Sequence, residues 1–121
     1  MGNAARFVDG YLDAWRTNDP DTIRALFAAD AVYRSRAHDT EPAAGIDRIV
    51  EHWLEEQDEP GSWSYELGAI ELDTDDFAVI RGVTAYTDGP KAGVYDNLWL
   101  VRFDADGRAT EFWDWWVQRR A

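Results

Sequence analysis

The amino-acid sequence predicts a single α+β domain, in which a curved antiparallel sheet packs against helices from the first half of the chain. Apolar side chains recur at helical spacing in residues 4–56, whereas residues 63–117 consist of β-branched and aromatic runs separated by short turns. Helices followed by strands are typical of the α+β class. The length of 121 residues fits one domain, and no linker or repeat divides it, so we expect residues 1–121 to form one unit.

Three helices are expected in the first half of the chain. The first covers residues 4–17, where apolar side chains return every three or four positions. The second covers residues 20–28, because Asp19 is a suitable N-cap and Pro20 is favourable at the first helical position. The third lies near residues 45–56, where the helical period resumes.

A short strand is expected at residues 31–35, and the polar, proline-containing stretch 38–44 is expected to be a loop. The second half of the chain then alternates between apolar runs and turns rich in Asp and Gly. Strands linked by such turns form an antiparallel meander. The four predicted strands of this meander cover residues 63–72, 77–86, 95–103 and 110–117.

The charge balance excludes several classes of partner. The chain has 24 Asp and Glu against 12 Lys and Arg, a formal net charge of −12, whereas nucleic acids and anionic membranes attract basic surfaces. We therefore expect no nucleic-acid partner and no membrane association. The chain has no Cys, and its first residues lack a basic leader followed by an apolar stretch, so a cytoplasmic location is expected.

No bound cofactor or metal is expected from the sequence. Two His and no Cys make a zinc site improbable, and His52 is expected to face solvent. The carboxylates at positions 55, 56, 58 and 59 are interpreted as a solvated helix end. No glycine-rich phosphate loop is present.

Three segments carry a resemblance to a known superfamily: YLDAWRTNDPDTIRALFAADAVY, EPAAGIDRIVEHW and NLWLVRFDADGRATEFWDWW. They resemble the nuclear-transport-factor-2-like superfamily, which includes ketosteroid isomerases, limonene-epoxide hydrolases, scytalone dehydratases and polyketide cyclases of the SnoaL type. The whole chain is most similar to SnoaL-like or polyketide-cyclase-like bacterial members. The resemblance implies a cone-shaped, cystatin-like α+β fold with an apolar pocket, and it implies no particular substrate.

The resemblance also suggests roles for individual residues. Tyr11 stands where ketosteroid isomerases keep a Tyr that donates to the developing enolate oxygen, but Ser35 and Trp99 stand where those enzymes need two carboxyl groups. Asp114 and Arg81 stand near an Asp and an Arg of the epoxide hydrolases, whose companion carboxylate is replaced by Val83. The resemblance therefore implies neither steroid isomerisation nor epoxide hydrolysis.

Strand alternation, combined with the resemblance, predicts which side chains face the pocket. The candidate catalytic residues are Asp114, as a general acid or base, Tyr11, as a hydrogen-bond donor, Arg81, as the partner of Asp114, and His38, in the loop at the expected pocket mouth. An Arg81–Asp114 pair with a purely structural role remains an equal alternative. The expected ligand-binding residues are Trp15, Phe27, Tyr33, Ser35, Trp53, Asn97, Trp99, Phe112 and Trp116.

Two functional hypotheses follow from this composition of the pocket. One is a cofactor-independent lyase, isomerase, cyclase or hydrolase acting on a small hydrophobic carbonyl compound or epoxide. The alternative is a non-catalytic protein that binds a small hydrophobic molecule in the same pocket. Trp113 and Trp115 are expected on the opposite face of the sheet, where a homodimer would cover them.

Overall fold

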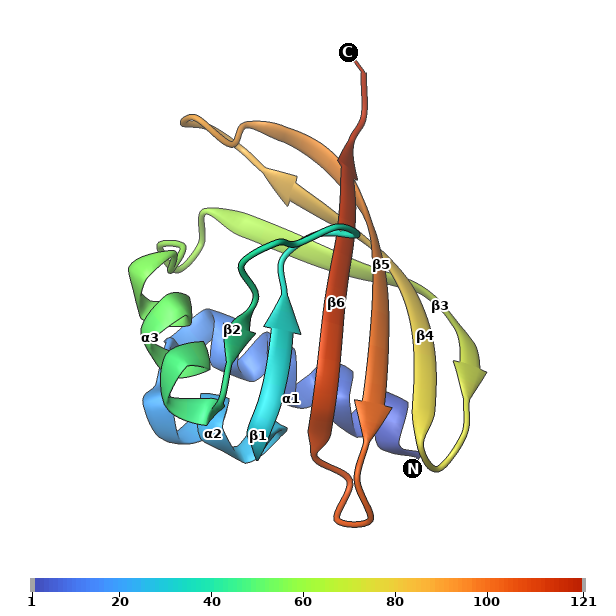
Figure 1. Ribbon diagram of the computed structural model, residues 1–121. Coiled ribbons are helices and arrows are strands. Elements are labelled where there is room, and N and C mark those ends of the chain that lie inside the picture. The colour runs from blue at the N-terminus through green and yellow to red at the C-terminus, as the bar shows by residue number, and fades with distance from the viewer. Residues whose placement is uncertain (1, 121) are drawn as a thin grey trace.

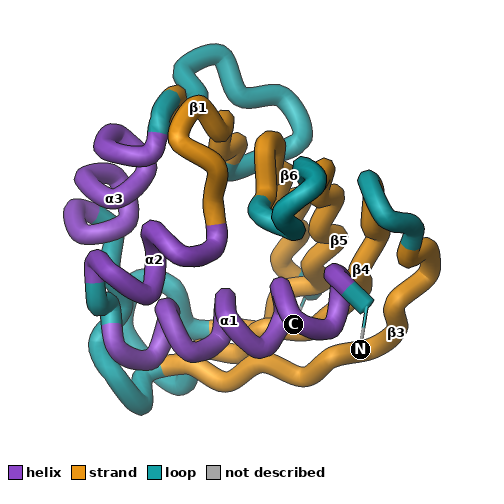
Figure 2. Tube along the Cα trace, turned by 90° about the horizontal axis from the view of Figure 1, so that it is seen from below, coloured by secondary structure: helices purple, strands orange, loops and turns teal. Residues whose placement is uncertain are grey.

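The computed structural model describes residues 2–120, and it confirms the α+β class: helices pack against a six-stranded sheet that curls without closing (Figure 1). The sheet has the order β2-β1-β6-β5-β4-β3. Seen from below, it curves from β1 through β6, β5 and β4 to β3, with α1 on its concave side (Figure 2). The elements are α1 (Asn3–Thr17), α2 (Pro20–Leu26), β1 (Phe27–Arg34), β2 (Ala43–Ala44), α3 (Ile46–Glu55), β3 (Trp63–Asp73), β4 (Phe77–Tyr86), β5 (Gly93–Phe103) and β6 (Ala109–Gln118).

A tight turn separates the two N-terminal helices. Asn18 is the C-cap of α1, and Asp19 is the N-cap of α2. Asn18 takes a left-handed conformation (φ 53°) and its N–H bonds the Ala14 carbonyl oxygen, which ends α1. The carboxylate of Asp19 accepts the N–H of Asp21 at 2.9 Å and begins α2, with Pro20 as the first helical residue. The predicted stop between the helices is therefore confirmed.

The first strand differs from the prediction. Helix α2 ends at Leu26, and β1 begins at Phe27, four residues before the predicted start. Part of the predicted loop, Ala43–Ala44, is the edge strand β2. β1 pairs with β6 in parallel, so the sheet is antiparallel throughout except at this one pair. A parallel pair needs a long crossover, and the chain between β1 and β6 supplies one.

The apolar core lies between α1 and the concave face of the sheet. Phe7 is its centre: its ring lies 5.4 Å from Phe112, 6.1 Å from Phe103 and 6.4 Å from Trp99, measured between centroids. These rings fill one end of the curl. Burial of aromatic side chains of this size is the main favourable contribution to such a fold. Tyr11 lies one turn further along α1. Beyond this residue the apolar core gives way to a cavity on the concave side of the sheet.

Candidate functional site

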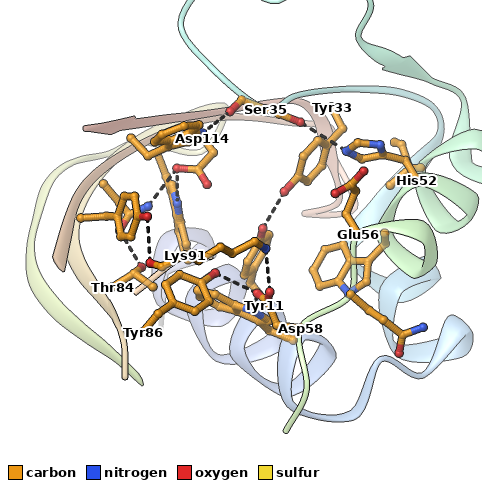
Figure 3. A pocket seen from close by; sticks show the side chains of 18 residues that line it. Tyr11, Tyr33, Ser35, His52, Glu56, Asp58, Thr84, Tyr86, Lys91 and Asp114 are labelled. Atoms are coloured by element: carbon orange, nitrogen blue, oxygen red, sulfur yellow. Dashed lines mark hydrogen bonds and ion pairs between the residues drawn. The ribbon is translucent and has the colours of Figure 1, made fainter. Parts of the chain in front are cut away.

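A cavity of about 390 Å³ lies between the concave face of the sheet and the helices (Figure 3). A volume of this size is typical of sites for small organic ligands. Trp and Tyr supply eight of its eighteen lining residues, and its polar groups come from helices, strands and loops. It is lined by Tyr11, Trp15, Tyr33, Ser35, Ile49, His52, Trp53, Glu56, Gln57, Asp58, Thr84, Tyr86, Lys91, Tyr95, Asn97, Trp99, Asp114 and Trp116.

Asp114 on β6 presents a carboxylate to this cavity. Its Oδ1 accepts two hydrogen bonds, from Asn97 Nδ2 and from Trp99 Nε1, each at 3.1 Å. Its Oδ2 accepts from no side chain in the described part of the chain, and Figure 3 shows the carboxylate turned to the cavity. Burial raises the pKa of Asp114 to about 6, although the two hydrogen bonds oppose this shift.

The orientation of Asn97 is fixed by Thr84 on the neighbouring strand. Thr84 Oγ1 donates to Asn97 Oδ1 at 2.6 Å, and both side chains are buried. Because the amide oxygen of Asn97 accepts from Thr84, its NH₂ group points to Asp114. A line of hydrogen bonds therefore runs from β4 through β5 to the carboxylate on β6.

Tyr11 and Tyr33 face each other across another part of the cavity. Their hydroxyl oxygens lie 2.7 Å apart (Figure 3). Burial raises the pKa of both phenols, and the nearby charge of Asp114 raises both further. Both groups are therefore neutral hydrogen-bond donors at ordinary pH. One of the two hydrogens is used within the pair, and the other can be donated to a ligand.

Ser35 and His52 form a further polar pair on the wall near α3. Ser35 Oγ lies 3.3 Å from His52 Nε2, and the Ser35 carbonyl oxygen accepts from Trp116 Nε1 at 2.7 Å. Trp116 is 47% exposed, so its indole lies partly over the cavity and partly in solvent. This wall offers a hydroxyl and an imidazole to a ligand.

The other wall is held together by Asp58, which follows α3. Its Oδ2 accepts from Trp15 Nε1 at 3.0 Å and from Tyr86 Oη at 2.8 Å, and its Oδ1 accepts from Lys91 Nζ at 2.7 Å. Burial acts to raise the pKa of Asp58, but the hydrogen bonds from Lys91, Trp15 and Tyr86 outweigh it and lower the pKa. Asp58 thus ties α1 to β4 and to the turn after β4.

The predicted pair of Arg81 and Asp114 does not form. Arg81 lies on the outer face of the sheet, where its side chain is 58% exposed and its Nη2 lies 3.1 Å from Oε1 of Glu71. In β4 the residues that face inwards are Ala78, Ile80, Gly82 and Thr84, so the predicted alternation of β4 was wrong by one residue. The predicted alternation of β5 and β6 places Asn97 and Asp114 correctly.

Three other predicted site residues also lie outside the cavity. His38 is exposed in the loop after β1. Phe27 and Phe112 are fully buried, and their rings pack at a centroid distance of 6.4 Å in the apolar core. Phe27 and Phe112 therefore support the walls from behind instead of forming them. The predicted residues that line the cavity are Tyr11, Trp15, Tyr33, Ser35, Trp53, Asn97, Trp99, Asp114 and Trp116.

Sequence reasoning missed several polar residues of the cavity. His52 was expected in solvent, yet it lies three residues after the buried Ile49, a spacing that places both on one helix face. Thr84 and Tyr86 share the inward alternation of β4 and were lost with the error in that strand. Asp58 and Lys91 lie in loops, where no periodic pattern could have indicated their direction.

A sequence model of the SnoaL-like domain matches residues 8–112, which is most of the chain. The chain belongs to the SnoaL-like family. Among curated proteins, none matches this SnoaL-like chain in sequence.

Solved structures similar to this SnoaL-like domain show the same fold. An LEH-like epoxide hydrolase from Mycobacterium tuberculosis is 22% identical, with a TM-score of 0.72 over 95% of this chain and 83% of that one. A ketosteroid isomerase-like protein from Erwinia carotovora atroseptica is 19% identical, with a TM-score of 0.65 over 95% and 94%. A proposed polyketide cyclase from Sinorhizobium meliloti is 21% identical, with a TM-score of 0.67 over 90% and 93%.

Residues 2–120 of this SnoaL-like chain contain no group of three or more His, Asp or Glu side chains placed to hold a metal ion. Within the same residues, no helix has the length and apolar character required to cross a membrane. The lining of the cavity offers carboxylates, phenols, an imidazole and amides.

Proposed function

We propose that this SnoaL-like protein binds a small hydrophobic organic molecule that carries an oxygen function, and moves a proton on it without a cofactor. The reaction classes that fit are isomerisation, cyclisation, elimination and hydrolysis of a carbonyl compound or an epoxide. Asp114 is the proton-transfer group of this proposal. The Tyr11 and Tyr33 pair donates a hydrogen bond to the oxygen that gains charge.

The proposal rests on the hydrogen bonds and the raised pKa of Asp114. Its Oδ1 is held by two donors, whereas Oδ2 is left for a ligand. A carboxyl with a pKa of about 6 is a stronger base than an ordinary Asp, and it is still mostly ionised at neutral pH. A group held in place with one free oxygen and a raised pKa is what a proton transfer near neutral pH requires.

The donor pair completes the arrangement. Because burial keeps both phenols protonated, the hydrogen left over from the Tyr11–Tyr33 bond can be given to a carbonyl or epoxide oxygen. A hydrogen bond of this kind gains strength as the oxygen becomes negative, and the aromatic walls keep water from competing with it. A ligand that fills the cavity contacts the donor pair and Asp114 together.

Solvent deuterium tests this proposal without knowledge of the natural substrate. A panel of small cyclic and unsaturated ketones is incubated with the protein in D₂O, and deuterium incorporation is followed by NMR; epoxides are followed by diol formation. We expect Asp114→Asn to lower the rate on any active compound by roughly 10²-fold or more while the ligand affinity is kept. Glu71→Gln removes a carboxylate on the outer face and should leave the rate unchanged.

The same experiment separates the enzyme from the non-catalytic alternative. If no compound in either panel is turned over, and Asp114→Asn only lowers ligand affinity, the protein is a binder of small molecules and the proposed reaction is wrong. If the rate is the same in Asp114→Asn and wild type, Asp114 does not transfer the proton.

We further propose that the protein forms a homodimer through the outer face of its sheet. Trp115 on that face is 39% exposed and lies opposite Leu98 of β5. Trp113, two residues earlier in β6, lies opposite Leu100. An exposed apolar face of this kind is often covered by a second subunit. Light scattering at micromolar concentration should give twice the mass of the chain, and Trp115→Lys should give a monomer. A wild-type monomer would contradict this proposal.

A further inference from the structure

Asp114 is a carboxylate inside the cavity, and no basic side chain of residues 2–120 forms an ion pair with it. Its two hydrogen-bond partners, Asn97 and Trp99, are neutral donors. Arg81 lies on the outer face, and the lysine that lines the cavity, Lys91, is bound to another carboxylate. His52 also lines the cavity, where its Nε2 lies 3.3 Å from Ser35 Oγ. An ion in such a place gains a large stabilisation from a partner of opposite charge.

Other carboxylates of the cavity add to this imbalance. Glu56 and Asp58 line it together with Lys91, so that, with Asp114, three carboxylates stand against one ammonium group. Lys91 crosses the cavity in Figure 3 and reaches Asp58. The whole chain has a formal net charge of −12, which repels anions and draws cations to its surface.

Aromatic rings form part of the same lining as Asp114. The ring of Tyr11 lies 4.6 Å from that of Trp99 and 4.9 Å from that of Trp53, measured between centroids. Tyr86 belongs to the same lining. The face of an aromatic ring attracts a cation, and most strongly where water is excluded. Aromatic walls with an unbalanced carboxylate form a site suited to a positive charge on a hydrophobic body.

We propose that the cavity binds organic cations, namely small hydrophobic amines in their protonated form, with the ammonium group donating a hydrogen bond to Oδ2 of Asp114. Molecules of the same shape that carry a carboxylate are rejected by the same charge. The inference rests on the proposed function only in taking this cavity as the ligand site. A bound ammonium occupies the oxygen that exchanges the proton in the proposed reaction, so amines compete with any substrate of that reaction.

Three probes of nearly the same shape and different charge test this inference. They are 1-naphthylmethylamine, which is protonated at pH 7.5, 1-naphthylmethanol, which is neutral, and 1-naphthoate, which is an anion. Isothermal titration calorimetry gives the dissociation constant of each with the wild-type protein. We expect the amine to bind at least about tenfold more tightly than the alcohol, and the naphthoate to bind most weakly.

Two variants locate the preference. Asp114→Asn keeps the shape of the side chain and removes its charge, so it should remove most of the difference between amine and alcohol. Glu71→Gln removes the same charge on the outer face, next to Arg81, and should leave the difference unchanged. Thermal melts of both variants show whether each is folded.

A second measurement uses the wild-type protein and does not depend on any variant. The side-chain NH₂ of Asn97 and the indole N–H of Trp99 both donate to Asp114, so their NMR signals should move when the amine binds. If these signals stay in place, or if the alcohol binds as well as the amine, the inference is wrong. Loss of turnover alone bears on the proposed reaction and not on this charge preference.

Discussion

The hydroxyl groups of Tyr11 and Tyr33 lie 2.7 Å apart, and they join the first helix to the first strand inside the cavity. Removal of one hydroxyl leaves the other, on buried Tyr11 or half-buried Tyr33, with no partner among the described residues. An unsatisfied buried hydroxyl costs about 1–3 kcal/mol, whereas removal of both hydroxyls removes the need for a partner.

We therefore predict that Tyr33→Phe and Tyr11→Phe each lower the free energy of unfolding by about 1–2 kcal/mol, and that the double variant loses less than the two together. Urea unfolding of the four proteins completes the double-mutant cycle, with an expected coupling of about 1 kcal/mol. Additive losses would mean that the two hydroxyls do not interact in solution.

The charge of Asp114 should also make stability depend on pH. The folded state holds this proton up to a pKa of about 6, whereas the ordinary value is 3.8, because burial disfavours the charged form. As pH rises from about 4, the unfolded chain loses the proton first and becomes relatively more stable. Between pH 4 and 6 the fold therefore loses on the order of 1–3 kcal/mol from this group.

Asp114→Asn removes this loss. We predict that its free energy of unfolding exceeds that of the wild type by about 1–3 kcal/mol above pH 6.5, and by little at pH 4. The Asn oxygen can still accept from Asn97 or Trp99, which keeps the comparison close. Chemical unfolding at several pH values measures the difference. A gap that is constant with pH would mean that Asp114 titrates at its ordinary pKa.

The order and type of the elements could be predicted from the sequence, because helical spacing and turn residues are local signals. The direction of the side chains in β4 could not. This strand has apolar residues on both faces, Ala78 and Ile80 inside, Val79 and Val83 outside, so alternation favours neither. In the structure, the charge of Arg81 determines which face of β4 is the outer one. On the outer face its guanidinium group reaches water and Glu71.

The polar residues of the cavity that were predicted lie in regular elements, except Ser35, which directly follows β1. Alternation places Asp114 on one face of β6 and Asn97 on one face of β5, and the resemblance to the superfamily indicated that these faces are the concave ones. Asp58 and Lys91 meet through loops that are 33 residues apart in the sequence, and their contact depends on the whole fold. A loop carboxylate that is buried by tertiary structure looks the same in the sequence as one in water.

Gly82 is expected to be essential because of Tyr65 on the adjacent strand. A Cβ atom at Gly82 would overlap the ring and hydroxyl of Tyr65, which stacks on Trp99 with centroids 4.9 Å apart. We predict that Gly82→Ala lowers the free energy of unfolding by about 2–3 kcal/mol and changes the near-ultraviolet circular dichroism of the protein, to which Trp99 contributes. In a Tyr65→Leu background the same substitution should be much less harmful. Equal losses in both backgrounds would rule out this overlap as the cause.

Asp58 should contribute more to stability than its ion pair with Lys91 alone. The Asp58 side chain is 13% exposed and accepts from Trp15, Tyr86 and Lys91, whereas Lys91 is 51% exposed and can return to water. Asp58→Ala leaves two half-buried donors without their acceptor, so we predict a loss of about 2–3 kcal/mol in the free energy of unfolding. Lys91→Met should lose no more than about 1 kcal/mol, as is usual for an exposed ion pair.

The contribution of the Asp58 charge to the free energy of unfolding should depend on pH. Its folded pKa is lowered, so its charge stabilises the fold above the ordinary value of 3.8, and this stabilisation is lost as pH falls through the lowered pKa. Asp58→Asn, which keeps an acceptor and loses the charge, should therefore differ most from the wild type at pH 6–7 and least near pH 2–3. Urea unfolding across this range measures the difference. A loss in Lys91→Met as large as in Asp58→Ala would mean that the ion pair, and not the hydrogen bonds from Trp15 and Tyr86, holds this wall of the cavity.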